Sequence, residues 1–334
     1  MSNVAIVILN WNGEKLLREF LPKVIETSKD YQIIVADNGS VDSSVELLKR
    51  NFSSVRLIEL GANYGFAGGY NRALKQVEAD YYVLLNSDIA PKNGWVEPII
   101  TLMESDQSIA CCQPKLLSYC QPDTFEYAGG AGGYIDYLGY PFCRGRIFSC
   151  LEKDTGQYDS MKEIFWATGA ALFVRANLFH TMGGLDEDFF AHQEEIDLCW
   201  RFKNAGYKIY CQPQSVCYHV GGASLNKTSP LKTFLNFRNN LFLLYKNLPD
   251  QSRNKILFVR FFLDIIASLT FALQGKGGEF CAVYKAYKDF WCKRSKMRAK
   301  RGPILNFNIK EVYPHSIVFA YHFSARKKFS SLEI

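Results

Sequence analysis

Several marks of common protein classes are missing from this chain of 334 residues. Its 10 cysteines form no Cys-x-x-Cys pair and no zinc-ligand spacing, which argues against a structural zinc domain. Scattered cysteines of this kind are typical of buried, reduced thiols in a cytosolic protein. The apolar run 4–9 is too short for a signal peptide and lacks a basic lead-in. We therefore expect a cytoplasmic protein.

Charge is distributed unevenly along the chain. From Lys276 to the end there are 13 Lys/Arg and 4 Asp/Glu, a net charge of +9, whereas the whole chain carries +6. Residues 1–275 therefore carry about −3. A basic tail beside an acidic body predicts an anionic partner, which is either a membrane surface or nucleic acid. Because no signature of a nucleic-acid-binding fold is recognisable, we expect a membrane surface and no nucleic acid.

Strand and helix patterns alternate through the first ninety residues. Hydrophobic residues make up 48% of the chain, enough for a large core. Short apolar runs predict strands at 4–9, 32–36, 55–60 and 81–85. Helical patterns lie between them at 14–28, 42–50 and 67–77. This order predicts an α/β fold with a mostly parallel, doubly wound sheet, which binds ligands beyond the carboxyl ends of its strands. Residues 118–157 show no clean period and are interpreted as a long, irregular excursion.

The C-terminal third has a different pattern. Residues 231–244 look helical, and 256–273 is an apolar run interrupted by Arg260 and Asp264. These two charges lie four residues apart and are expected to pair on one helical face. Each would be costly at a bilayer centre, so we favour a helix at the membrane interface over a span or a buried core helix. The basic stretch 293–301 would suit anionic headgroups, although a solvated basic face would look the same.

Polar residues follow three of the predicted strands. The carboxylate of Asp37 would suit the ring N–H of uracil or thymine, and Asp42 would cap the next helix. The stretch 63–71 matches neither G-x-G-x-x-G nor a P-loop, but its glycines let backbone approach a phosphate at a helix start. Ordinary capping and packing turns would also explain these two segments. Asn86 and Asp88 offer oxygen ligands for Mg²⁺ or Mn²⁺.

Carboxylates in the segment 165–224 are poorly explained by solubility alone. Glu194 and Glu195 fall between an aromatic loop and a stretch with helical pattern. Together with the acidic loop 86–88, they indicate a site that holds a metal ion and removes a proton. His219 follows in the same segment, either as a metal ligand or as a structural residue.

These elements, in this order, resemble glycosyltransferase family 2, the inverting enzymes of the GT-A fold. The resemblance covers about residues 3–225 and looks closest to the rhamnosyltransferase-like branch that builds bacterial surface polysaccharides. It implies that Asp37 reads the nucleotide base and that Asp88 holds the metal and diphosphate. It also implies that Glu195 is the catalytic base, preceded by Glu194, and that His219 is a third metal contact. The family's Asp-x-Asp motif reads Asn-Ser-Asp here, so only Asp88 keeps its carboxylate.

The same resemblance assigns a donor-binding set and leaves some roles open. Trp166 lies either at the donor sugar or acceptor pocket or in the core, and Asp197 is expected to pair with Arg201. The residues assigned to the donor are Asn10, Asp37, Asn38, Asp42, Asn63, Gly65, Gly68, Asn71, Asn86, Ser87, Trp166 and Gly169.

The expected function is inverting transfer of a sugar from a UDP-, dTDP- or GDP-sugar to a hydroxyl of a lipid-linked saccharide. Residues 1–230 would form the catalytic domain, with a nucleotide half at about 1–117 and an acceptor half at about 118–230. Residues 231–334 would form a helical, basic extension that holds the enzyme at the inner face of the plasma membrane. A non-catalytic carbohydrate- or nucleotide-binding module is one alternative. A sugar nucleotidyltransferase is another, although it would carry a glycine-rich, basic loop in place of the acidic segment 10–14.

Overall fold

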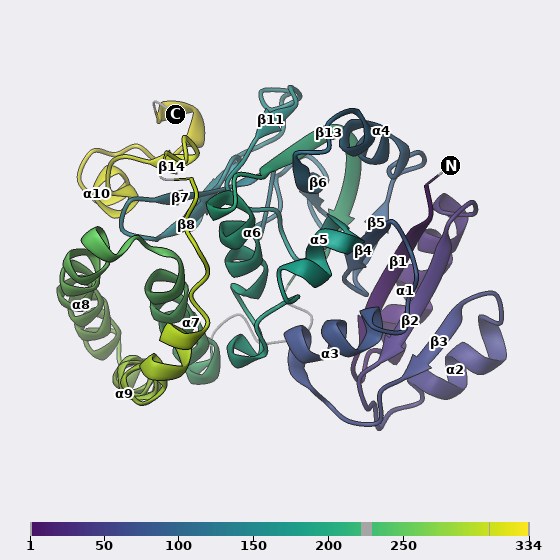
Figure 1. Cartoon of the computed structure of the whole chain (residues 1–334), viewed down its shortest axis with the longest axis horizontal. Helices are drawn as coiled ribbons and strands as arrows, with labels where there is room; N and C mark the ends of the chain where they lie inside the picture. The colour runs from purple at the N-terminus through teal and green to yellow at the C-terminus, as the bar shows by residue number, and fades with distance from the viewer. Residues whose placement is uncertain (1, 222–228, 307, 333–334) are drawn as a thin grey trace.

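The computed structural model, which describes residues 2–221, 229–306 and 308–332, is built around one large sheet (Figure 1). Within the described residues this sheet has the strand order β11-β13-β6-β12-β4-β1-β2-β3, and β5 pairs with β13. Its strands are β1 (Val4–Asn10), β2 (Gln32–Asp37), β3 (Arg56–Glu59), β4 (Tyr81–Leu85), β5 (Ile89–Pro91), β6 (Ile109–Ser118), β11 (Lys162–Glu163), β12 (Ala171–Arg175) and β13 (Lys208–His219). The α/β class is therefore confirmed.

Six helices belong to this part of the described chain. They are α1 (Glu14–Thr27), α2 (Ser44–Asn51), α3 (Gly65–Leu74), α4 (Glu97–Ser105), α5 (Ala176–Thr181) and α6 (Glu194–Asn204). The first seven strands and helices match the predicted ones within three residues at each end. β1 is buried along nearly its whole length, as an uninterrupted apolar run between two helical layers requires.

The strand directions are more mixed than the sequence predicts. β1 pairs in parallel with β2 and β4, whereas β12 pairs antiparallel with both β4 and β6. A buried apolar run shows that a strand is covered on both faces, but it does not show which way the strand runs. The parallel half carries the strand ends at which ligands are expected.

The stretch 118–157 is not irregular, which corrects the sequence-based interpretation. It contributes β7 (Gly133–Asp136), β8 (Pro141–Cys143), β9 (Arg146–Ile147) and β10 (Cys150–Leu151) to a second sheet. β14 (Val312–Tyr313), from the end of the chain, completes that sheet by pairing with β7. Strands of two to four residues are too short to show a period of two, which explains why the pattern missed them.

The C-terminal third forms a group of helices beside the sheet (Figure 1). They are α7 (Pro230–Asn247), α8 (Asp250–Leu273), α9 (Gly277–Ala299) and the short α10 (Ile317–His322). By length and composition α8 would be able to cross a membrane, and only 17% of its apolar window is buried in the protein. The alternative of a buried core helix is therefore wrong.

A buried ion network joins α7 to α6. The Lys246 ammonium lies 2.6 Å from Asp186 and 2.9 Å from Asp197, and Arg201 pairs with Asp197 at 2.9 Å as predicted. Asn247 donates a further hydrogen bond to Asp197 at 2.9 Å. Although burial opposes ionisation of Asp197, Lys246 and Arg201 lower the pKa of its carboxyl. The C-terminal helices are thus bonded to the helix that carries the two glutamates.

We expect Lys246→Ala to lower the free energy of unfolding by about 3–5 kcal/mol, because it leaves two buried carboxylates without their shared cation. Urea denaturation measures the change. Lys255→Ala removes an exposed cation of α8 and should stay within about 0.5 kcal/mol of the parent. A similar, small change in both variants would contradict the structural role of the network.

Candidate active site

The carboxyl ends of β1 and β2 form one wall of the site. Asp37 accepts hydrogen bonds from the side-chain amide of Asn10 at 3.2 Å and from the Ser40 backbone at 3.0 Å. Both Asn10 and Asp37 are buried. The Asn10 side-chain oxygen has no hydrogen-bond partner among the described residues. A buried acceptor without a donor is uncommon in folded proteins, so this corner has capacity for a further polar group.

A second wall comes from the loop before α3, which packs against the loop before α6. Asn38 donates to the Asn63 side chain at 3.2 Å and to the Gly65 carbonyl at 3.1 Å. Gly65 has a φ of +71°, and a Cβ there would lie 2.6 Å from the Phe190 ring. The Phe66 backbone donates to the Phe190 carbonyl at 2.9 Å. Gly65 is therefore required for close contact between the two loops.

Several predicted donor residues already have protein partners. Asn71 bonds both the backbone carbonyl of Leu185, at 2.7 Å, and its backbone amide, at 3.0 Å. Asp42 accepts from the backbone amides of Glu14 at 3.0 Å and Ser44 at 3.1 Å, the first residues of α1 and α2, although the N-cap positions are Gly13 and Ser43. Gly68 lies within α3, in the turn after Tyr64.

The residues after β4 contact the end of β13. Asp88 lies 3.1 Å from Nε2 of His219, and its other oxygen accepts from the Gly221 amide at 3.2 Å. Nδ1 of His219 lies 3.3 Å from Glu126, and the Asn86 amide lies 3.5 Å from Nε2. Although burial opposes ionisation, His219 lowers the pKa of Asp88, while the two carboxylates raise the pKa of His219 to about 10.

This cluster has a donor set that fits a divalent ion. Two ligands on one ion with bonds of about 2.1 Å lie about 3 Å apart, which is the spacing of Asp88 and His219. Glu126 faces the other ring nitrogen, the usual position of a carboxylate that orients a metal-binding histidine. Among the described residues no three His, Cys, Asp or Glu side chains form a complete metal site. Ligand oxygens would have to complete the coordination shell.

The two glutamates begin α6 and differ in environment. Glu194 is buried and one of its carboxyl oxygens has no hydrogen-bond partner among the described residues, whereas Glu195 is partly exposed. Burial and the neighbouring Glu195 raise the pKa of Glu194 well above its usual range. Burial also raises the pKa of Glu195, to about 7, although nearby backbone amides, including that of Gly169, favour its ionised form. Glu195 is therefore poised to exchange a proton near neutral pH.

Gly169 lies between Glu195 and the other walls of the site. A Cβ at Gly169 would lie 3.4 Å from the Phe66 ring and 3.7 Å from Cβ of Glu195. The next residue, Ala170, accepts a hydrogen bond from the Asn86 amide at 2.9 Å. Glu195 thus lies beside the end of β4, and Ser87 lies opposite Gly13 after β1. The structure brings the predicted loops together at the carboxyl ends of the strands.

Trp166 lies in the core. It is buried, its indole N–H donates to the Tyr134 carbonyl at 2.9 Å, and its ring covers Gly133. Of the two positions that the sequence left open for Trp166, the structure shows the one in the core.

Two site residues were missed by the sequence analysis. Glu126 lies in the glycine- and tyrosine-rich stretch without a recognisable motif, and only the fold brings it to His219. Asn239 of α7 donates to the carbonyls of Phe189 at 3.0 Å, Ala191 at 2.8 Å and His192 at 2.7 Å. An amide in a helix of the C-terminal third carries no sequence signal for contact with a loop fifty residues earlier.

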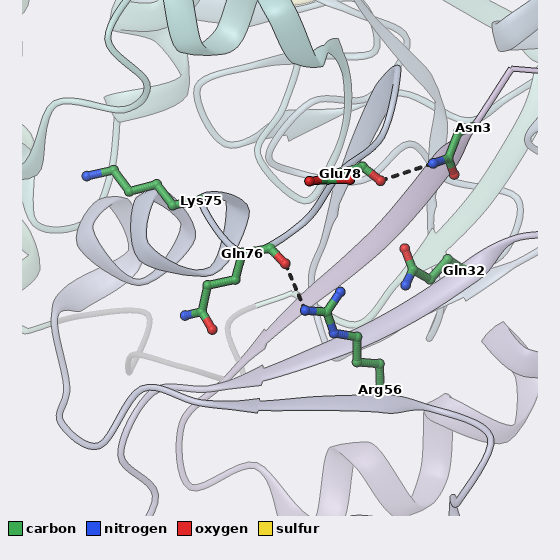
Figure 2. A pocket seen from close by; sticks show the side chains of 6 residues that line it. All are labelled: Asn3, Gln32, Arg56, Lys75, Gln76 and Glu78. Carbon is green, nitrogen blue, oxygen red and sulfur yellow. Dashed lines mark hydrogen bonds between the residues drawn. The ribbon is translucent and has the colours of Figure 1, made fainter.

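A polar hollow of about 770 Å³ lies away from the predicted site residues (Figure 2). It is formed at the amino ends of β1, β2 and β3 and by residues after α3. Its side chains bind backbone: Arg56 donates to the Gln76 carbonyl at 2.8 Å, and Asn3 to the Glu78 carbonyl at 3.0 Å. These contacts use much of its polar lining. The hollow lies at the amino ends of the strands, whereas ligands are expected at their carboxyl ends.

Comparison with known proteins gives the same family as the motifs. Residues 5–130 match the model of glycosyl transferase family 2. An N-acetylglucosaminyl-diphospho-decaprenol L-rhamnosyltransferase of Mycobacterium tuberculosis is 24% identical over 234 residues, which are 64% of this chain and 75% of that protein.

Solved structures agree in fold. The mannosyltransferase PcManGT of Pyrobaculum calidifontis, in complex with GDP-Man and Mn²⁺, has a TM-score of 0.52 at 14% identity. The similarity covers 90% of this chain and 86% of that one. The TarS protein of S. aureus in complex with UDP-GlcNAc has a TM-score of 0.56 at 14% identity and covers 90% and 84%. The chain carries a glycosyltransferase family 2 domain at residues 5–130, has the GT-A fold and is a glycosyltransferase.

Proposed function

We propose that this enzyme transfers a sugar, with inversion, from a nucleotide-sugar donor to a hydroxyl of a lipid-linked saccharide in surface polysaccharide synthesis. The observation that carries the proposal is the position of Glu195, a partly buried carboxyl with a pKa of about 7 beside the end of β4. Residues 1–230 would carry the chemistry and 231–334 the helical extension. The name of the mycobacterial relative supports a saccharide acceptor on a lipid carrier and a rhamnosyl donor.

The nucleotide would lie across the carboxyl ends of β1 and β2. Asp37 would accept the ring N–H of a uracil or thymine base, and the unpartnered oxygen of Asn10 would accept a second donor from the nucleotide. Asn38 and Asn63 would act by holding the loop at Gly65 in place. The start of α3 lies behind this loop and would favour the diphosphate.

Asp88 and His219, with Asn86 beside them, would hold a divalent ion, Mg²⁺ or Mn²⁺, against the diphosphate once the ion displaces the proton from Nε2 of His219. When bound, the ion supplies positive charge where negative charge grows as the nucleoside diphosphate leaves. The Mn²⁺ in the related mannosyltransferase structure supports this assignment. Glu126 would keep His219 in the orientation that directs Nε2 to the ion.

Glu195 would take the proton from the acceptor hydroxyl as that oxygen attacks the anomeric carbon. A base with a pKa near the working pH accepts a proton readily and is still ionised in about half of the molecules. Glu194, whose pKa is raised further, would stay protonated and add no second negative charge. A single base on the face opposite the leaving group makes the transfer inverting.

The surface of α8 supports attachment to a bilayer at the cytoplasmic face of the plasma membrane. Its apolar side chains point outward, with Phe258 64%, Ile266 59% and Leu273 88% exposed. Its charged pair points inward, with Arg260 2% and Asp264 1% exposed. A helix of a soluble domain has the reverse arrangement, so the outer face of α8 would contact lipid.

Neighbouring residues extend this surface. Phe319 and Phe323 of α10 are exposed across a groove of about 690 Å³ from Val259 and Leu263 of α8. Lys327 and Lys328 follow them, exposed, and would suit anionic headgroups.

Only part of the predicted basic stretch 293–301 is free for headgroups. Lys296 pairs with Asp188 at 2.6 Å, and Lys300 pairs with Asp188 at 2.6 Å. Arg294 and Arg298 are exposed and remain candidates for contact with anionic lipid.

We expect Glu195→Gln to lower kcat by about 10²–10⁴-fold while donor affinity changes little, because the amide cannot accept the proton. Glu194→Gln, its matched control, replaces a protonated carboxyl with a neutral isostere and should keep most of its turnover. Steady-state kinetics and calorimetric titration with the nucleoside diphosphate measure the two effects. Loss in the Glu194 variant alone would assign the base to that residue instead.

The pH dependence follows from the raised pKa of Glu195. Below about pH 7 the base is protonated and inactive, so kcat/KM should fall by about tenfold per pH unit as the solution becomes more acidic. A carboxyl at its ordinary pKa would keep the enzyme fully active to about pH 5. Constant kcat/KM between pH 5 and 7, with the fold intact by circular dichroism, would exclude Glu195 as a base of this pKa.

We expect Asp88→Asn to weaken binding of Mn²⁺ in the presence of nucleoside diphosphate, which electron paramagnetic resonance measures without a turnover assay. Glu126→Gln should weaken it by about 10–100-fold, the usual effect of removing a partner of a ligating histidine. Asp123→Asn changes an exposed carboxylate that pairs with Lys153 and should have no effect. Equal Mn²⁺ affinity in all three variants, or full activity in chelator, would reject the metal site.

The double variant Phe262→Ser/Ile266→Ser should lower binding to anionic vesicles by at least about tenfold, because burying each side chain contributes ~1.5–3 kcal/mol. Val41→Ser changes a still more exposed apolar residue between β2 and α2, at the other end of the molecule from α8, and should bind as the parent does (Figure 1). Co-sedimentation measures binding. Unchanged sedimentation of the double variant would contradict the proposal that α8 contacts the membrane.

A further inference from the structure

The ion pair of α8 is an unusual feature of an otherwise apolar helix. Arg260 and Asp264 are both buried and lie 3.3 Å apart. Replacing a buried ion pair with apolar side chains is often neutral or stabilising, so the pair itself does not explain why charge is kept here. The outer face of α8 does not use it either, because both side chains point inward. The groups that Arg260 and Asp264 contact explain why this buried pair is present.

Arg260 contacts the second sheet and α7. Its guanidinium donates to the Leu138 carbonyl at 3.0 Å, lies 3.9 Å from the centre of the Tyr140 ring, and donates to the side-chain oxygen of Asn240. Asp264 is fixed on the other side by the Tyr287 hydroxyl at 2.8 Å. The guanidinium is therefore held in one orientation.

A chain of hydrogen bonds runs from this guanidinium to the catalytic loop. The Asn240 amino group donates to the Gln193 side-chain oxygen at 3.2 Å and to the Gly139 carbonyl at 2.8 Å. The Gln193 amino group donates to the Asn236 carbonyl at 3.1 Å. Gln193 is the residue directly before Glu194 and Glu195.

Arg260 fixes the Asn240 end of this chain. A guanidinium only donates hydrogen bonds, so the Asn240 oxygen must face it and the amino group faces Gln193. The Gly139 and Asn236 carbonyls, which only accept, favour the same orientations of the two amides. Without the cation, the Asn240 oxygen would lose its charged donor and the relay would be held more loosely.

The loop needs such support because its backbone is strained. Phe190, His192 and Gln193 have φ values of 65°, 71° and 71°, which non-glycine residues adopt only when their surroundings enforce it. Asn239 holds the carbonyls of residues 189, 191 and 192, while Gln193 is held by its side chain. Release of Gln193 would free the turn that leads into α6.

We propose that Arg260 is a positioning residue for the catalytic base, acting through Asn240 and Gln193 to hold the start of α6. The inference rests on the proposed role of Glu195 and extends it to the membrane-facing helix. One face of α8 contacts lipid, and the other fixes the loop that carries the base.

The test removes the relay without leaving a buried charge. Arg260→Met/Asp264→Leu should keep the urea midpoint and vesicle binding of the parent but lower kcat by at least about tenfold. KM for the donor should stay unchanged, since its residues lie on other loops, and the acid limb of the kcat profile should shift. Arg260→Lys keeps a donor for Asn240, so its kcat should fall less than that of the double variant. Lys255→Met, a matched loss of an exposed cation from α8, should have no effect.

A second variant covers the case in which the double variant does not fold. Asn240→Asp keeps the contact with Arg260 but places an oxygen against the Gln193 oxygen, and should lower kcat and shift the same acid limb. Parent-like kcat and pH profile in Asn240→Asp would overturn the proposal, as would the same result in a folded double variant. Glu195→Gln is measured alongside: if it stays active, the proposed base is wrong, whereas if it is inactive and the relay variants are normal, only the relay is wrong.

Discussion

The site depends on one constraint: neighbouring carboxyl groups at the start of α6 are buried away from water. Glu194, Glu195 and Asp197 lie within four residues. The positive end of the helix dipole favours anions there, but it does not stabilise three of them. The two adjacent cations, Lys246 and Arg201, both pair with Asp197. Glu194 and Glu195 pair with no cation among the described residues, so burial raises the pKa of Glu194 well above its usual range and that of Glu195 to about 7.

The C-terminal helices are therefore more than an attachment to the catalytic part. One turn of α7, residues 236–240, binds the loop before α6 on one side and Arg260 of α8 on the other. The same extension supplies Lys246 beneath α6 and Lys300 beside Asp188. A helix surface suited to lipid is thus one helix away from the loop that carries the proposed base. This proximity would suit an acceptor whose saccharide emerges from a bilayer.

The sequence predicted those parts of the fold and site that depend on local pattern. Continuous apolar runs located the parallel strands, the motif after β4 pointed to Asp88, and the pair of glutamates before a helical pattern pointed to Glu195. The second sheet escaped prediction because its strands are too short to show a period. Glu126 and Asn239 escaped because their partners lie far away in sequence, and a single Glu or Asn has no motif. The inverted surface of α8 was partly predictable: the spacing of its two charges gave their pairing, but only packing shows which face is covered.

As the proposed base, Glu195 should have a pKa near neutrality in the free enzyme. A ¹³C NMR titration of glutamate side-chain carboxyls, with Glu195 assigned by comparison with Glu195→Gln, measures this directly. We expect a resonance that titrates at about pH 7 and is absent from the variant. A Glu195 resonance that titrates in the ordinary range of exposed glutamates, near 4.3, would contradict it.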